Sequence, residues 1–177
     1  MSDQKTQLKA LLAELHQALH ALVGSYRQLL EIVRVERTAL LDADLTAVQG
    51  ATHAKEAQIE IIRQAELKRV QLVQELAMVW RFAIKDLTLN KIILEAQAVD
   101  AALSETLRTD LTTLTLLMER TAEQNTKNKE ICIRSLKHIG EMKKNVLGEA
   151  EPKNETYSKK AQKVNSTGGG RLISGEA

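Results

Sequence analysis

The sequence predicts an all-α fold: an antiparallel bundle of long coiled-coil-like helices, three long and one short, followed by a flexible C-terminal tail. Three observations support this. The 177 residues include only four aromatic side chains and one proline, whereas β-sandwiches and barrels favour aromatic and β-branched residues. Apolar residues recur at alternating steps of three and four along most of the chain, which is the spacing of one helix face. No glycine or proline interrupts residues 51–139.

The first helix is expected over about residues 4–41. Its apolar side chains keep a/d spacing over five heptads, which is typical of a packed helix, and Glu36 fills the one gap in the stripe. The apolar members are Leu8, Leu12, Leu15, Leu19, Leu22, Tyr26, Leu29, Val33 and Leu40.

A corner follows at Asp42-Ala43-Asp44, where either aspartate can cap the next helix. So short a link makes the first two helices antiparallel neighbours. The second helix is expected over about residues 44–85, and its stripe contains polar residues. The stem of Lys55 can lie along the stripe with its ammonium group in water. Glu66 and Arg69, one turn apart, either form an intrahelical pair or face a partner.

The helical pattern is poorest at residues 86–90, where Asp86 or Thr88 can cap a short helix near residues 89–97. A third long helix is expected over about residues 100–147 and ends before Gly148 and Pro152. The bundle is therefore expected to occupy residues 1–148. Residues 149–177 are polar and contain three consecutive glycines, so we expect a flexible tail.

The stripe of the third long helix is unusual because it carries Asn125 and Asn128. Two asparagines on such a stripe cost stability unless they are hydrogen-bonded. They either fix the register inside the bundle or belong to a half-polar groove for another helix. The groove interpretation predicts contacts with a partner at Leu114, Leu117, Met118, Thr121, Asn125, Asn128, Cys132, Ile139 and Met142.

Composition argues against several other classes of protein. Residues 151–177 carry five basic and three acidic residues, which accounts for the whole net charge of +2, so a neutral body offers little to nucleic acid. We find no secretory signal and no apolar run long enough to span a membrane, and a single cysteine, Cys132, forms no intrachain disulfide. We therefore expect a cytoplasmic protein without membrane insertion.

No enzyme, metal site or cofactor is expected either. His16 and His20 stand four residues apart, but the sequence between them lacks the glutamate of a zinc-protease motif, and a partly exposed helix face is the simpler interpretation. The residues after His53 and His138 do not fit a phosphotransfer histidine. Cys132 lies on the apolar stripe with no histidine nearby in sequence, which indicates a packed thiol.

Several short motifs, in order and spacing, resemble FlgN-type flagellar export chaperones. The resemblance covers most of residues 8–165, and the family usually has glycine where this chain has Ala161. The motifs are Leu29-Leu30, Glu36-Arg-Thr-Ala39-Leu40, Asp44-Leu45-x-x-Val48, Lys55, Ile61-Ile62, Ala65-Glu66-x-x-Arg69, Leu87-Thr88-Leu89-x-x-Ile92-Ile93, Asn125-x-x-Asn128, Ser135-Leu136-x-x-Ile139 and Tyr157-Ser-Lys-Lys-Ala161.

The resemblance implies a chaperone for hook–filament junction proteins, the hook-associated proteins of the FlgK and FlgL type. Such a chaperone binds the amphipathic C-terminal helix of its client, prevents premature assembly, and delivers the client to the export gate and export ATPase complex of the flagellar apparatus. By the same resemblance Tyr157 is predicted to make a contact during docking at the gate. The alternative is a structural coiled-coil or adaptor protein that self-associates, for example as a homodimer, and has no secreted client.

Overall fold

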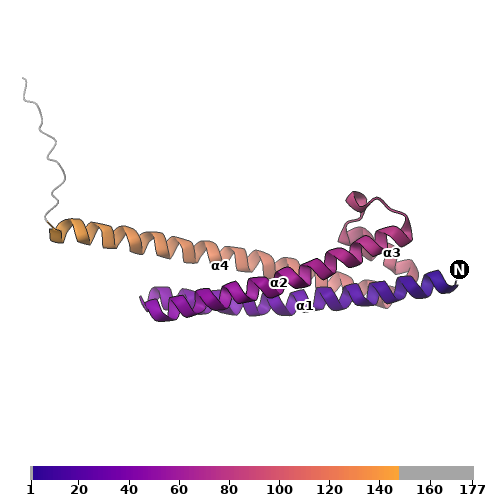
Figure 1. Cartoon of the computed structure of the whole chain (residues 1–177), viewed down its shortest axis with the longest axis horizontal. Helices are drawn as coiled ribbons and strands as arrows, with labels where there is room; N and C mark the ends of the chain where they lie inside the picture. Colours follow the sequence, from indigo (N-terminus) through magenta and orange to yellow (C-terminus); the bar gives the residue numbers. More distant parts are fainter. Residues whose placement is uncertain (1, 148–177) are drawn as a thin grey trace, which may run out of the picture. The chain divides into compact units, whose positions relative to one another are not determined.

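The computed structural model describes residues 2–147, with side chains from residue 4, so the expected tail 149–177 and Tyr157 lie outside the described residues. The elements are α1 (Ser2–Leu41), α2 (Leu45–Trp80), the 3₁₀ turn η1 (Ile84–Asp86), α3 (Leu89–Val99) and α4 (Ala101–Leu147), with no strand among the described residues (Figure 1). The all-α prediction of three long helices and one short one is confirmed. The chain divides into two units, Met1–His138 and Ile139–Ala177. This division falls inside α4, whereas the sequence pattern placed the end of the bundle at residue 148.

α1 and α2 form an antiparallel hairpin within the first unit. Lys68 Nζ lies 3.2 Å from Glu14 Oε2 in the N-terminal half of α1, and Lys55 Nζ lies 2.6 Å from Glu36 Oε2 near its C-terminal end. Residues later in α2 therefore meet residues earlier in α1. The predicted apolar stripe of α1 faces inward, and Leu12, Leu15, Leu19 and Val33 are fully buried. The burial of leucine side chains, at about 1.5–3 kcal/mol each, is the main stabilising term in such a hairpin.

The corner between α1 and α2 ends α1 with a left-handed residue. Ala43 has φ of 55°, and the Asp44 N–H donates to the Ala39 carbonyl at 3.0 Å, which is the hydrogen bond of a Schellman cap. Asp44 then caps α2, because its Oδ1 accepts from the Ala47 N–H at 3.0 Å. Of the two aspartates predicted as caps, Asp44 has this role.

α2 ends at Trp80, five residues before the end predicted at residue 85. Arg81 has φ of 58°, and the Phe82 N–H donates to the Ala77 carbonyl at 3.0 Å, so a second Schellman cap stops the helix. The rings of Trp80 and Phe82 then lie 6.4 Å apart between centroids, and Lys91 Nζ lies 4.1 Å from the Phe82 centroid. The prediction failed here because left-handed caps are usually glycine and this one is arginine.

α3 packs its apolar face into the bundle at the end where α1 begins (Figure 1). Of the two caps predicted, Asp86 and Thr88, Thr88 has this role, since its Oγ1 accepts from the Lys91 N–H at 3.3 Å. Ile92 and Ile93 are buried. The buried Ser104 hydroxyl of α4 donates to the Ile93 carbonyl at 2.7 Å and fastens the two helices together.

α4 runs parallel to α1 and so antiparallel to α2 within the first unit. Lys9 Nζ lies 2.8 Å from Asp100 Oδ2 just before α4, and Asn128 Nδ2 donates to the Val33 carbonyl at 2.9 Å further along both helices. One continuous core joins all four α-helices. Its largest fully buried members are Leu12, Leu15, Leu19, Leu22, Val23, Leu72, Leu76, Ile92 and Leu107.

The last part of α4 is exposed. Residues 133–138 of the first unit and residues 139–147 of the second all have exposed side chains. Among the described residues, no helix is both long and apolar enough to cross a membrane.

Candidate functional site: a groove between α2 and α4

A groove of about 370 Å³ opens between α2 and α4 in the first unit. α2 forms one wall with Ile62, Glu66 and Arg69, and α4 forms the other. α1 contributes Leu22 and Tyr26, and α3 contributes Leu89. The α4 wall consists of Leu111, Leu114, Thr115 and Met118.

The groove is apolar because the stripes of three long helices converge there. Leu22 and Leu114 are buried at its base, and Ile62 and Leu111 are partly buried. At the rim Met118 is 46% exposed, and methionine is a flexible side chain that adapts to different apolar partners. A buried base with an adaptable rim can receive apolar side chains from one face of another helix.

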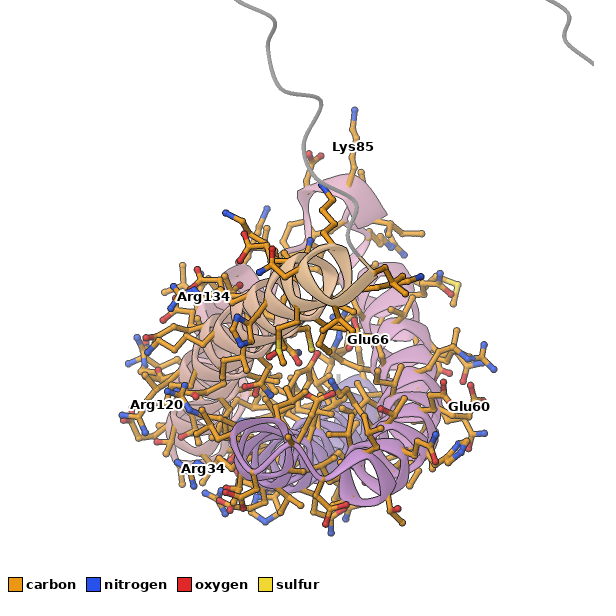
Figure 2. All side chains as sticks on the ribbon, turned by 90° about the vertical axis from the view of Figure 1, so that its left-hand side faces the viewer. Arg34, Glu60, Glu66, Lys85, Arg120 and Arg134 are labelled. Atoms are coloured by element: carbon orange, nitrogen blue, oxygen red, sulfur yellow. The ribbon has the colours of Figure 1, made fainter. Side chains whose placement is uncertain are left out.

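One charged pair interrupts this apolar lining. Arg69 Nε donates to Glu66 Oε2 at 2.9 Å, and Arg69 Nη2 donates to the other carboxylate oxygen. The predicted intrahelical pair is therefore present, and both of its members also line the groove. Partial burial, with the charge of Glu66 as a second cause, raises the pKa of Tyr26, so its hydroxyl stays a proton donor. Viewed along the bundle, Glu66 points inward from α2 whereas Glu60 points outward (Figure 2).

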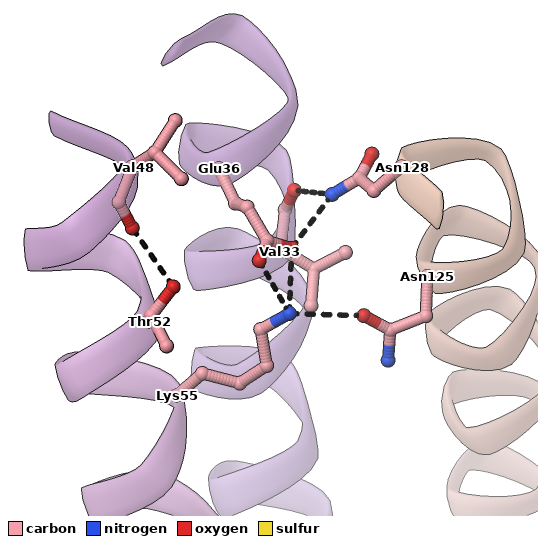
Figure 3. Close-up of polar contacts among 7 residues, drawn as sticks. All are labelled: Val33, Glu36, Val48, Thr52, Lys55, Asn125 and Asn128. Carbon is pink, nitrogen blue, oxygen red and sulfur yellow. Dashed lines mark hydrogen bonds and ion pairs between the residues drawn. The ribbon is translucent and has the colours of Figure 1, made fainter. Parts of the chain in front are cut away.

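A second polar cluster lies further along the bundle and joins all three long helices (Figure 3). Lys55 Nζ donates to both carboxylate oxygens of Glu36 at 2.6 Å and to Asn125 Oδ1 at 3.3 Å. Asn128 Nδ2 donates to Glu36 Oε2 and to the Val33 carbonyl, both at 2.9 Å. The sequence suggested that the ammonium group of Lys55 lies in water. In the structure it instead contacts Glu36 of α1 and Asn125 of α4. These contacts support the interpretation of the two asparagines as a register device.

The structure divides the predicted partner contacts among several places. Leu114 and Met118 line the α2–α4 groove, whereas Leu117 borders a wider depression of about 650 Å³ beside Arg27 and Gln58. The remaining described positions are buried Thr121 and Asn128, partly buried Asn125 and Cys132, and exposed Ile139 and Met142 in the second unit. The structure thus brings two of the predicted residues together in one groove. Thr121 and Asn128 are only 4% and 3% exposed, so a partner has little access to them in this arrangement.

The sequence did not indicate the α1 and α3 residues of the groove. Tyr26 and Leu22 belong to a stripe that predicts core packing, and nothing in their spacing distinguishes a groove from a filled interior. The polar positions Glu66 and Arg69 were the available signal, because charged residues on an otherwise apolar stripe need a local explanation.

His16 and His20 contact a buried residue of α4, and their spacing in the sequence does not indicate this contact. Asp110 of α4 lies with Oδ2 3.0 Å from His16 Nδ1 and with Oδ1 3.5 Å from His20 Nδ1. Within residues 2–147, no group of three or more His, Cys, Asp or Glu side chains is arranged to hold a metal ion. The contact joins α1 to α4.

Comparison with known proteins identifies the family of the chain. The family model described as FlgN protein matches residues 1–165, which is most of the chain. Searches of curated proteins and of solved structures found no match. The match includes the α2–α4 groove, the polar cluster and both hairpin helices. The chain therefore belongs to the FlgN family of flagellar export chaperones, which bind flagellar export substrates.

Proposed function

We propose that this chaperone binds the amphipathic C-terminal helix of a hook-associated protein of the FlgK or FlgL type, and that the α2–α4 groove receives the apolar face of that helix. Binding takes place in the cytoplasm, prevents premature assembly of the client, and precedes its delivery to the export gate and export ATPase complex. The single observation that carries this proposal is an apolar groove, open to solvent, on a member of an export-chaperone family.

The geometry of the groove suits a helix. Its α2 wall uses residues 62, 66 and 69, and its α4 wall uses residues 111, 114, 115 and 118, so each wall presents side chains at steps of one helical turn. A client helix with apolar residues at i, i+3, i+4 and i+7 offers side chains at the same repeat. Burying that stripe removes the apolar surface through which unassembled clients would aggregate.

The other predicted contacts have different places in this proposal. Ile139 and Met142 are exposed and are proposed as further apolar contacts made by the second unit. Cys132 and Asn125 stay predictions as client contacts, as do Leu117, Thr121 and Asn128. The contact of Tyr157 with the export gate also stays a proposal, resting on the family resemblance.

The test is a titration of Met118→Glu with synthetic C-terminal segments of hook-associated proteins. A carboxylate at the rim would be desolvated by an apolar client face, so we expect affinity to fall at least about tenfold. Met78→Glu is the matched control, since Met78 is an exposed methionine of α2 that does not line the groove. Calorimetry measures the affinities, and circular dichroism checks that both variants fold.

The proposal fails if the wild-type chaperone binds none of these segments. If wild type and Met118→Glu bind the segments with equal affinity, the client binds outside the groove.

The second candidate function is that of a self-associating structural protein, and it is favoured by exposed Ile133 and Leu136 in the first unit. Sedimentation equilibrium separates the two, because a tight homodimer that binds no client supports self-association.

A further inference from the structure

Arg69 is placed in a part of the groove where a charged side chain has little access to water. Its side chain is 20% exposed, and its neighbours along the groove include Tyr26, Ile62 and Met118. Arg63, two turns earlier on α2, makes the same fork with Glu60, with both nitrogen–oxygen distances at 2.8 Å, but is 63% exposed. The two pairs have the same local geometry and differ in whether a groove surrounds them.

Glu66 does not satisfy all the donors of Arg69. A guanidinium group has five N–H donors, and the fork with Glu66 uses one on Nε and one on Nη2. Among residues 2–147, Arg69 has no hydrogen bond or ion pair with any residue besides Glu66. The hydroxyl of Tyr26 lines the same groove and can donate or accept. Three N–H donors of Arg69 are therefore left for water or for an incoming acceptor.

These spare donors of Arg69 restrict which helix can fill the groove. An occupant with a wholly apolar stripe would cover the remaining N–H groups of Arg69 and leave them without water or an acceptor, which is costly. A carboxylate in the stripe would instead receive charge-assisted hydrogen bonds from Arg69. Glu66 is 46% exposed, so its side chain can turn toward solvent when a second carboxylate arrives.

We propose that Arg69 determines specificity within the groove by pairing with an aspartate or glutamate in the apolar stripe of the client helix. The inference rests on the proposed function, since it identifies what that client carries. It assigns two tasks to one groove: the apolar walls bind any amphipathic helix weakly, and Arg69 selects the helix and the register that bring a carboxylate beside it.

The experiment measures how wild type and variants of the full-length chaperone discriminate between a client peptide and altered versions of it. The first peptide is the C-terminal helix of a hook-associated protein that binds wild type. The others are versions of that peptide in which each acidic residue of the apolar stripe is changed singly to its amide. The chaperones are wild type, Arg69→Gln and the matched control Arg63→Gln. Calorimetry gives the ratio of affinities for parent and amide peptides.

We expect wild type and Arg63→Gln to bind one amide version about tenfold more weakly than they bind the parent peptide. Arg69→Gln should bind that amide version and the parent peptide with equal affinity. Arg69→Lys, which keeps the charge but not the fork, should retain part of the discrimination and guards against misfolding of Arg69→Gln. A merely structural Arg69 would change both affinities together and leave their ratio unchanged.

Two results overturn this inference while the proposed function stands. The first is that the parent peptide has no acidic residue in its apolar stripe, or that every amide version binds wild type as tightly as the parent peptide does. The other is unchanged discrimination by Arg69→Gln. If wild type binds no hook-associated segment at all, the proposed function fails and this inference fails with it.

Discussion

The ammonium nitrogen of Lys55 lies 2.6 Å from both carboxylate oxygens of Glu36, which links α2 to α1 in a largely buried setting. Charges placed there destabilise a bundle unless each has its partner. Asn125 and Asn128 complete the arrangement from α4, so a shift of α4 by one turn would separate both asparagines from their partners on α1 and α2. The cluster therefore penalises alternative registers of the three long helices.

The first prediction concerns the buried amide of this cluster. Asn128 is 3% exposed and gives Glu36 one of its hydrogen bonds, so Asn128→Leu should lower the free energy of unfolding by about 1–2 kcal/mol. The loss is limited because Asn128 Oδ1 is itself buried with no hydrogen-bond partner in the described part of the chain, and leucine removes that cost. Urea unfolding followed by circular dichroism measures the change. Unchanged stability together with weaker client binding would instead support a direct client contact at this residue.

The second prediction uses the left-handed residue at the hairpin corner. Ala43 has φ of 55°, a conformation that disfavours a side chain with a Cβ atom and that glycine adopts freely. Ala43→Gly should therefore raise the free energy of unfolding by up to about 1 kcal/mol. Ala47→Gly, inside the first turn of α2, is the control and should destabilise. Thermal unfolding of the two variants in parallel checks the sign, and a lower melting temperature for Ala43→Gly would contradict the prediction.

The third prediction concerns pH. The hydrogen bond from Lys9, followed by that from the Leu103 N–H, lowers the pKa of Asp100 from its ordinary value of 3.8. A lowered carboxyl pKa means that Asp100 stabilises the fold above about pH 4 and that this stabilisation disappears as the pH falls through the native-state pKa. Asp100→Asn should have a lower melting temperature than wild type at pH 7.

The difference between wild type and Asp100→Asn should shrink below pH 4, because both then carry an uncharged side chain. Melting temperatures across pH 2.5–7 provide the measurement. A difference that stays constant over this range would show that capping by the side chain, not its charge, supplies the stabilisation.

Regular spacing made most of the fold predictable. The α1 stripe from Leu8 to Leu40 and the short corner before Asp44 fix the antiparallel hairpin, because both depend on local sequence alone. The cap of α3 was narrowed to Asp86 or Thr88, because capping also depends on local sequence, and Thr88 is the cap. The early end of α2 was missed because Arg81 adopts a backbone conformation that its side chain does not indicate.

The candidate site was less predictable because its residues come from four helices. Sequence spacing identifies which residues share a face, but it does not show which faces meet. Leu114 and Met118 were placed on one stripe, while Tyr26 and Leu89 join them only through tertiary packing. Lys55 and Glu36 were likewise recognised as polar residues on two stripes without any sign that they contact each other.

Two separate stretches of α4 have two separate tasks. Leu111, Leu114, Thr115 and Met118 line the groove, and Asn125 with Asn128 closes the charged cluster. Substitutions at the rim, at Thr115 and Met118, leave the partners of that cluster untouched. Under the proposed function, client preference can therefore diverge among descendants of this protein by small steps, without a simultaneous change in how the helices assemble.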